Sequence, residues 1–391
     1  MKLNGFNKVL AGAGLVIVMA GCSSKKDNVT VTEPTTVEQD KKSITDTRNL
    51  LFNCVKNIKD GQLIQSLINT AGLKNGDFGN EDWLNSITDA LDVSFNYFEL
   101  EEGGRFNYAR FAGNYNWDAA TKKFIKTAAA DITVSFPSSP TGTTNNYVVK
   151  MSTYKDGKYQ VNMKDVYLPT AVKATCTKDG QTILSLDLAA VFSNGSFPIP
   201  QSIVLNLGLM PHNYLIKVNK ITNTQFNVVT ELQSGSDCVT ALNAKVTFAN
   251  EDYNNLELSE DLQAVEGTIS KGDLSLQGSW NAAAYYKLSG HKAEDINGTF
   301  ALNTFSKEQK IGELKLKNIN NHNELVIFYK DQTSEAFNVY TDPFIADLKT
   351  MLKPYFGSDI ENWFERTAQS NGSFSKKITR LKTRLSEWIN K

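Results

Sequence analysis

The feature that most constrains the fold is a long central region, residues 93–341, in which β-rich runs alternate with tight-turn residues. Apolar and polar residues alternate with period two in these runs, which is typical of strands that bury one face. Asp-Gly and Asn-Gly pairs tolerate the positive φ that two-residue hairpins require. The region therefore predicts a long antiparallel meander. Its predicted turns are Gly103-Gly104, Asp156-Gly157, Asp179-Gly180, Asn194-Gly195, Gly272-Asp273 and Asn297-Gly298.

The clearest strand covers residues 181–192, where leucines take one face and polar residues take most of the other. The next run, around residues 203–209, repeats this pattern. Because one face is apolar and the other mixed, we expect the sheet to curve around its apolar side as an open or half barrel. An apolar face of this kind is a candidate ligand surface. Its candidate residues are Leu184, Leu186, Leu188, Ile203, Leu205 and Leu207.

Helical patterns flank the β region on both sides, in residues 43–92 and 342–391. Each predicted helix is short and apolar on one side only, so it needs a partner surface to be stable. Asp342-Pro343 supplies a cap and a proline that suits the first helical position. The sequence thus predicts an α+β fold in which N-terminal and C-terminal helices pack against the sheet.

The last predicted helix carries an apolar face among many basic residues. Such a helix can lie on an anionic membrane surface. The alternative, which we favour, is a solvated basic face over a stripe that packs on the core. The apolar face comprises Ile378, Leu381, Leu385, Trp388 and Ile389.

The N-terminus has the pattern of an export signal, which we assign to residues 1–21. Lys2 and Lys8 precede an apolar run at residues 9–20. This run is too short to span a bilayer, which takes about 20 residues. It ends in Met19-Ala20-Gly21-Cys22, which resembles the lipobox of bacterial lipoproteins. The resemblance implies that Cys22 is acylated, and several acyl chains on one cysteine form a lasting membrane anchor.

Residues 22–42 are polar and show no apolar periodicity, so we expect a disordered tether. Ser23, rather than an aspartate, follows Cys22. By resemblance to the sorting rules of Gram-negative bacteria, this favours the outer membrane. Surface-exported lipoproteins often carry an acidic run at this point, whereas this chain has Lys25-Lys26-Asp27. The periplasmic face is therefore favoured over the cell surface.

The charge balance excludes a broad basic field. Lysine and arginine number 41 and aspartate and glutamate 42, which gives a formal net charge of −1. Recruitment of nucleic acid requires clustered positive charge, so we expect no nucleic-acid partner.

Three cysteines follow Cys22, and their odd number and wide spacing argue against a disulfide framework. Cys54 falls on an apolar helix face and Cys176 in an alternating strand, so both are expected to be small buried hydrophobes. A bridge between Cys176 and Cys238 remains an open alternative.

Catalytic motifs are missing from the sequence. It contains no HExxH, CxxC, phosphate-binding loop or GxSxG elbow. His212, His291 and His322 lie far apart in predicted loops, where exposure to solvent is the simpler expectation than a zinc site. We therefore expect a non-enzymatic protein without a metal or other cofactor.

Several motifs in the β region resemble a known group of proteins. Gly113-x-Tyr115-x-Trp117 and Ile132-x-Val134-x-Phe136-Pro137 are similar to an uncharacterised group of Bacteroidota outer-membrane lipoproteins. Tyr167-Leu168-Pro169 extends the likeness to about residue 210. The resemblance implies a cell-envelope location and a lineage, and no chemistry.

Two classes of function are consistent with these patterns. In the first, the apolar face binds a lipid, an acylated partner or a segment of an envelope protein. In the second, the protein is a surface glycan-binding accessory lipoprotein, whose Tyr115, Trp117 and Trp280 stack on sugars. The alternative for these aromatics is core filling, which is commoner for rings in alternating strands. Exposure of the leucine face or of the aromatic rings distinguishes the two classes.

Overall fold

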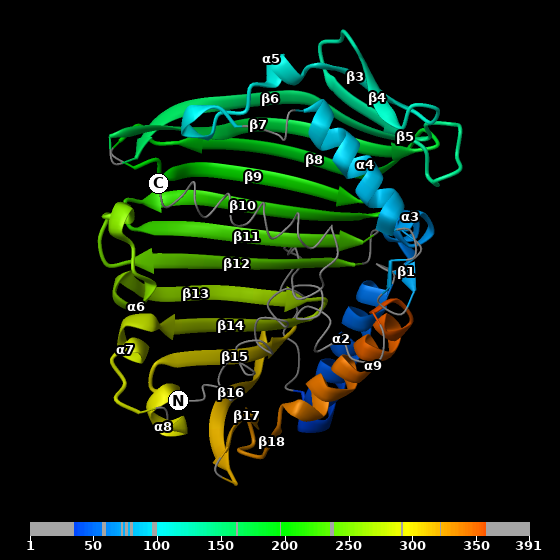
Figure 1. Ribbon diagram of the computed structural model, residues 1–391. Helices are drawn as coiled ribbons and strands as arrows, with labels where there is room; N and C mark the ends of the chain where they lie inside the picture. The colour runs from blue at the N-terminus through cyan, green and yellow to red at the C-terminus, as the bar shows by residue number, and fades with distance from the viewer. Residues whose placement is uncertain are drawn as a thin grey trace. The chain divides into compact units, whose positions relative to one another are not determined.

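The computed structural model describes residues 35–356, except for 57–59, 72, 75, 76, 79, 80, 96–99, 162, 196, 235–237, 291 and 321. It confirms the α+β class, because helices flank open, mostly antiparallel strand ladders (Figure 1). The chain divides into two compact units. Of the described residues, the first comprises 35–56, 199–204 and 212–347, and the second comprises 60–198, 205–211 and 348–356.

The strands of the first unit form an antiparallel meander. Each strand from β10 to β18 pairs with the next one along the chain. Short connections suffice for this order, as the spacing of the predicted turns indicates. The strands are β10 (His212–Thr222), β11 (Gln225–Ser234), β12 (Val239–Phe248), β13 (Leu262–Lys271), β14 (Leu274–Asn281), β15 (Phe300–Ser306), β16 (Gln309–Ile319), β17 (His322–Tyr329) and β18 (Ser334–Ala336).

The helices of the first unit cover one face of this meander. Ile44 of α2 packs with Leu314 of β16, Ile327 of β17 and Tyr340 of α9 in a buried cluster. α2 and α9 lie next to one another, with the rings of Phe52 and Phe344 6.3 Å apart (Figure 1). The helices are α2 (Val37–Lys56), α6 (Leu258–Asp261), α7 (Ala282–Tyr286), α8 (Ala293–Asn297) and α9 (Asn338–Phe356), which belongs to this unit up to Asp347; η4 (Tyr253–Asn255) is a 3-10 turn.

The start of α2 corrects the predicted tether, because the helix begins at Val37 and not after residue 42. The backbone N–H of Thr36 donates to Gln39 Oε1 at 2.7 Å, and that of Gln39 donates to Thr36 Oγ1 at 3.3 Å. This reciprocal pair is a capping box, which satisfies two otherwise unpaired donors at a helix start. A polar composition therefore concealed a helix N-terminus.

The C-terminal boundary also differs from the prediction. α9 begins at Asn338, so Asp342-Pro343 lies within the helix and not at its start. The backbone N–H groups of Tyr340 and Thr341 both donate to Phe337 O, which closes the first turn ahead of Pro343. The predicted basic helix, with Ile378 to Ile389, lies outside the described residues.

The second unit contains the strand order β8-β7-β6-β5-β3-β4. β3 and β5 pair in parallel, whereas the other neighbouring strands from β3 to β8 pair antiparallel. Its elements are α3 (Gln62–Ala71), β1 (Leu73–Lys74), β2 (Asp77–Phe78), α4 (Glu81–Ser94), the 3-10 turn η3 (Glu102–Gly104), α5 (Tyr108–Phe111), β3 (Gly113–Asp118), β4 (Lys123–Thr127), β5 (Ile132–Phe136), β6 (Tyr147–Val161), β7 (Lys164–Lys178) and β8 (Gln181–Phe192); β9 (Pro200–Leu209) is divided between the two units at Val204.

These bounds revise the predicted start of the β domain at residue 93. α4 extends to Ser94, and the first strand of the larger sheet begins at Gly113. The predicted helical segment 43–92 is also interrupted by the short β1–β2 pair.

The predicted turns have mixed outcomes. Asp179-Gly180 joins β7 to β8 with positive φ at both residues, and Gly272 has positive φ between β13 and β14. Both hairpins are confirmed. Asp156-Gly157 instead lies inside β6 next to a β-bulge, and Asn297-Gly298 ends α8. Both predictions of hairpins there are wrong, because a residue pair that tolerates a turn also suits a bulge or a helix end.

An aromatic core holds the second unit together. Trp83 of α4 contacts Trp117 of β3 edge to face, with ring centroids 5.4 Å apart. Phe95 stacks on Tyr115 at 4.5 Å, and the Tyr115 hydroxyl donates to Phe111 O at 2.8 Å. Offset and edge-to-face ring pairs of this kind contribute beyond their buried area.

A disulfide joins Cys54 of α2 to Cys238, the residue before β12, with Cα atoms 5.7 Å apart. Cys176 is a free, half-buried thiol. The expectation that Cys54 is only a small hydrophobe is therefore wrong, and so is the alternative bridge from Cys176 to Cys238. Cys54 and Cys238 meet because α2 packs on the sheet, which sequence spacing does not reveal.

Candidate binding surfaces

An apolar surface follows β6, β7 and β8 in the second unit. Met151, Ala174 and Leu186 lie opposite one another on the three strands, and directly opposite residues share a face. The rows on either side repeat the arrangement. We define the apolar surface as Val149 and Met151 of β6, Val172, Ala174 and Cys176 of β7, and Leu184, Leu186 and Leu188 of β8.

Side chains of this surface are only partly covered by described residues. Leu184, Leu186 and Leu188 are half-buried and belong to none of the three buried clusters that the described residues form. Val149 is 40% exposed. The opposite face of the same strands is polar, since Lys173 and Asp187 form an ion pair of 3.0 Å there. The two faces thus differ sharply in chemistry.

Contacts near the first and last rows of the apolar surface fix its borders. The Tyr147 hydroxyl donates to Ser66 O of α3 at 3.3 Å, and the Tyr108 hydroxyl donates to Met151 O at 2.7 Å. The ring of Tyr154 contacts Phe106 edge to face. Partial burial raises the pKa of the Cys176 thiol, which keeps it neutral. Between these borders the surface contains no charged group.

The structure brings together five of the six predicted ligand-face residues. A Cβ on Gly208 would lie 2.3 Å from Ser185 Oγ, so Gly208 shares the polar side of β8. By strand alternation, Leu205 and Leu207 therefore lie on the same face as Leu186. Ile203 belongs to the part of β9 in the first unit.

The predicted sugar-stacking role of Tyr115 and Trp117 is wrong. Their side chains are 1% and 7% exposed, and both lie in the aromatic core with Phe95 and Trp83. A buried ring offers no face to a sugar. Trp280 is half-buried and packs against the rings of Tyr285 and Tyr286 at 5.6 and 6.0 Å. Core filling, the alternative interpretation, describes all three residues better.

A polar groove of about 530 Å³ lies on the first unit, and sequence reasoning did not predict it. Most of its side chains come from β11 to β15 and form two rows of cross-strand neighbours. Ile221 of β10 also lines it. The polar groove is defined by the first row, Asn227, Lys245, Glu266, Ser279 and Ala301, and by the second row, Asn243, Thr268, Gln277 and Asn303.

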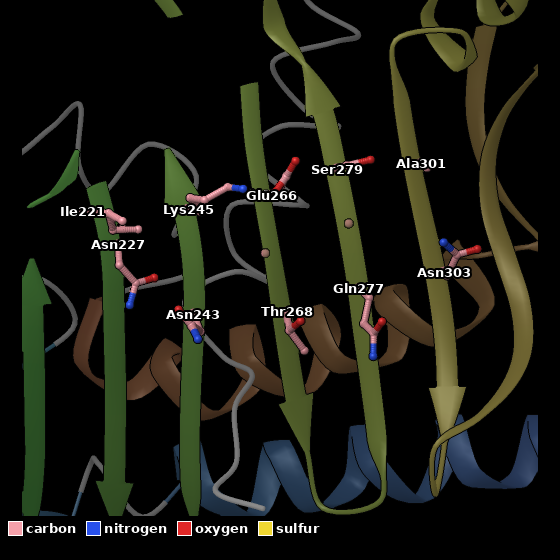
Figure 2. Close-up of a pocket in the computed structure, with 12 residues that line it drawn as sticks. Ile221, Asn227, Asn243, Lys245, Glu266, Thr268, Gln277, Ser279, Ala301 and Asn303 are labelled. Carbon is pink, nitrogen blue, oxygen red and sulfur yellow. Dashed lines mark ion pairs between the residues drawn. The ribbon is translucent and has the colours of Figure 1, made fainter. Parts of the chain in front are cut away.

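The polar groove lies on the face of the sheet away from the helices. Leu274, Leu276 and Leu302 pack towards Ile44 of α2, so the alternating residues of β14 and β15 point to the other side. Figure 2 shows α2 and α9 behind the strands that carry the groove side chains. One face of this sheet is thus covered by helices, whereas the other presents amides and hydroxyls.

The groove is electrically balanced. Lys245 Nζ and Glu266 Oε2 form an ion pair of 2.6 Å across β12 and β13 (Figure 2). Asn227, Asn243, Gln277 and Asn303 make no hydrogen bond with the described residues through their side-chain amides. These amides are therefore available as both donors and acceptors for a ligand.

A buried cluster of titratable groups lies elsewhere in the first unit. The hydroxyls of Tyr329 and Tyr340 are 2.8 Å apart, and both donate to Glu335 Oε1. Burial raises the pKa of both tyrosines, and their hydrogen bonds to Glu335 raise these values further. Lys41 of α2 lies 3.4 Å from Glu335. The cluster links α2, β17, β18 and α9, and we interpret it as structural.

The two histidines that the structure describes do not belong to a metal site. His212 is buried at the start of β10, which corrects the expectation of an exposed loop residue, and His322 is exposed on β17. His291 lies outside the described residues, as does Cys22. Among residues that the structure describes, no group of three His, Cys, Asp or Glu could hold a metal ion. Within the same residues, no helix has the length and apolar character needed to cross a bilayer.

No known protein family, no curated protein and no solved structure matches this chain.

Proposed function

We propose that this protein is a non-enzymatic lipoprotein of the outer membrane, anchored through Cys22, that binds a hydrophobic ligand on its apolar surface. The acyl chain of a lipid is the ligand class that we favour, and an apolar segment of an envelope protein is the second. Support for the anchor is the lipobox-like Met19-Ala20-Gly21-Cys22 and, as a resemblance, the motifs shared with Bacteroidota lipoproteins.

One observation carries the binding proposal: the half-buried leucines of β8 stand outside every buried cluster of the described residues. Burying a leucine side chain completely contributes about 1.5–3 kcal/mol. The leucine row and its neighbours on β6 and β7 would therefore gain several kcal/mol from an acyl chain. Hydrogen bonds are not needed for such a ligand, because the surface offers no polar side chain of its own.

The test is native mass spectrometry of the chain lacking residues 1–28, purified from a Gram-negative host. Organic extraction then identifies any phospholipid or fatty acid that is retained. We expect retained lipid in the wild type and its loss in Leu186→Asp, because a carboxylate in an apolar contact must be desolvated.

Val191→Asp is the matched control. Val191 lies on the same strand but on the opposite face and is 57% exposed, so this substitution should leave lipid retention unchanged. A wild-type protein free of lipid after purification would contradict the proposal. It would also direct attention to a protein ligand, which cross-linking from Leu186 in envelope extracts would identify.

A further inference from the structure

The polar groove has a regular geometry that is independent of the apolar surface. Asn243, Thr268, Gln277 and Asn303 lie directly opposite one another on four consecutive strands. Neighbouring strands are about 4.8 Å apart, so these four side chains form a straight row about 14 Å long. The other row, through Lys245 and Glu266, runs parallel to this one. It is two residues away on each strand, or about 7 Å.

A linear glycan matches this spacing. In an extended β-1,4-linked chain, the repeat from one sugar to the next is comparable to the distance between strands. Because neighbouring sugars of such a chain are turned by about half a turn, a chain that lies across β11 to β15 would present equivalent hydroxyl groups to every second strand, such as β12 with Asn243 and β14 with Gln277. An extended peptide lying in the same direction would not repeat its side chains at this interval, because its residues are only about 3.3 Å apart.

Groove chemistry also favours an uncharged sugar. The Lys245–Glu266 pair leaves the lining without net charge, and the remaining side chains are amides and hydroxyls except for Ile221 and Ala301. Amides both donate and accept hydrogen bonds, as the hydroxyl and acetamido groups of sugars require. Phe305, two residues beyond Asn303 on β15, lies opposite Ser275 and on the same face, where a half-buried ring can contact a sugar.

From this geometry we infer that the polar groove binds an uncharged, β-1,4-linked linear glycan across strands β11 to β15. The unpaired amides of Asn243, Gln277 and Asn303 donate to and accept from its hydroxyl or acetamido groups. Lys245 and Glu266 hold one another in place along the other row. The site differs from the predicted aromatic platform, since Tyr115 and Trp117 take no part in it.

The test measures binding of chitohexaose and of cellohexaose to the full chain in mild detergent, by isothermal titration calorimetry. We expect saturable binding of at least one of the two hexasaccharides. The double substitution Asn243→Ala and Gln277→Ala should weaken that binding about tenfold or more, since each lost hydrogen bond lowers the affinity severalfold. Both side chains are exposed and make no hydrogen bond with the described residues, so folding should be unaffected.

Asn213→Ala is the matched control, because Asn213 is an exposed asparagine on β10 outside the groove. It should bind as the wild type does. Failure of both hexasaccharides to bind the wild type would overturn the inference. So would equal affinities of the wild type and the double variant. Lipid retention on the apolar surface is a separate readout and should not change in the double variant.

Discussion

At the scale of single residues, the strongest electrostatic feature is the carboxylate of Glu335. Burial disfavours its charged form, yet hydrogen bonds from Tyr329 and Tyr340 and the charge of Lys41 outweigh that cost, so that its pKa is lowered. The Glu335 side chain is 26% exposed, so its ion pair with Lys41 is not fully solvated. Because the partners come from α2, β17 and α9, the carboxylate joins three elements.

We predict that Glu335→Gln lowers the free energy of unfolding by about 1–3 kcal/mol near neutral pH, because hydrogen bonds to a charged acceptor are lost. A lowered folded-state pKa stabilises the protein above the unfolded-state value of about 4.3, and this contribution disappears as the pH falls through the folded-state value. The difference between variant and wild type should therefore shrink in acid. Chemical denaturation from pH 7 to pH 3 measures it.

Glu324→Gln on the same strand as Tyr329 serves as the control and should change the stability little. If Glu335→Gln and the wild type differ equally at pH 7 and pH 3, the charged state of Glu335 does not contribute.

Sequence reasoning located the leucines of β8 because strand alternation is a local property. It failed for Tyr115 and Trp117, whose burial depends on Phe95 and on Trp83 of α4, some 20 to 34 residues away. The polar groove was also missed. Each of its strands contributes only one or two ordinary polar residues, and the rows exist only once the register is known.

At the scale of elements, α2 is held against the sheet at both ends. Near its start, the fully buried Asp40 forms an ion pair of 3.1 Å with Lys330. Near its end, the disulfide joins Cys54 to Cys238. Ile44 packs into the buried cluster between these two points. The helix therefore contributes to the core of the first unit and is not a detachable segment.

We predict that the double substitution Cys54→Ala and Cys238→Ala lowers the stability by about 2–4 kcal/mol, the usual effect of a disulfide that closes a long loop. The wild type should show a similar loss after reduction. Thermal unfolding followed by circular dichroism, with and without reductant, checks both. Cys176→Ala removes the free thiol and should leave the response to reductant unchanged. A double variant, Cys54→Ala with Cys238→Ala, that melts at the same temperature as the oxidised wild type would contradict the prediction.

The class of the fold and most strands could be predicted from sequence, because period-two alternation and turn residues act over a few positions. The ends of elements could not. Thr36 and Gln39 cap α2 through a pair of hydrogen bonds that depends on geometry, and the parallel pairing of β3 with β5 depends on contacts between separate runs. The structure at Asn297-Gly298 could not be predicted either, because an Asn-Gly pair suits a helix end as well as a hairpin.

At the scale of the whole molecule, the two units present different chemistry. In the first, helices cover the apolar face of the sheet and the polar face carries the groove. In the second, the leucine row of β8 is half-buried. A lipid and a glycan could therefore be bound by one chain without competing for the same side chains.

We predict that the full chain incorporates labelled palmitate when expressed in a Gram-negative host and fractionates with the outer membrane. Cys22→Ala should abolish both the label and the membrane association, because we propose that the Cys22 thiol is the site of acylation. Cys176→Ala should retain both. Labelled Cys22→Ala protein would contradict the assignment of the lipobox.

The early start of α2 also sets how far the body can move from its anchor. Only thirteen residues lie between Cys22 and Thr36. Whatever its conformation, a chain of this length spans at most about 50 Å. If Cys22 is the anchor, the start of α2 stays within this distance of the membrane surface, which is close to the thickness of the bilayer itself. The first unit can then bind only partners that lie close to the membrane in which Cys22 is anchored.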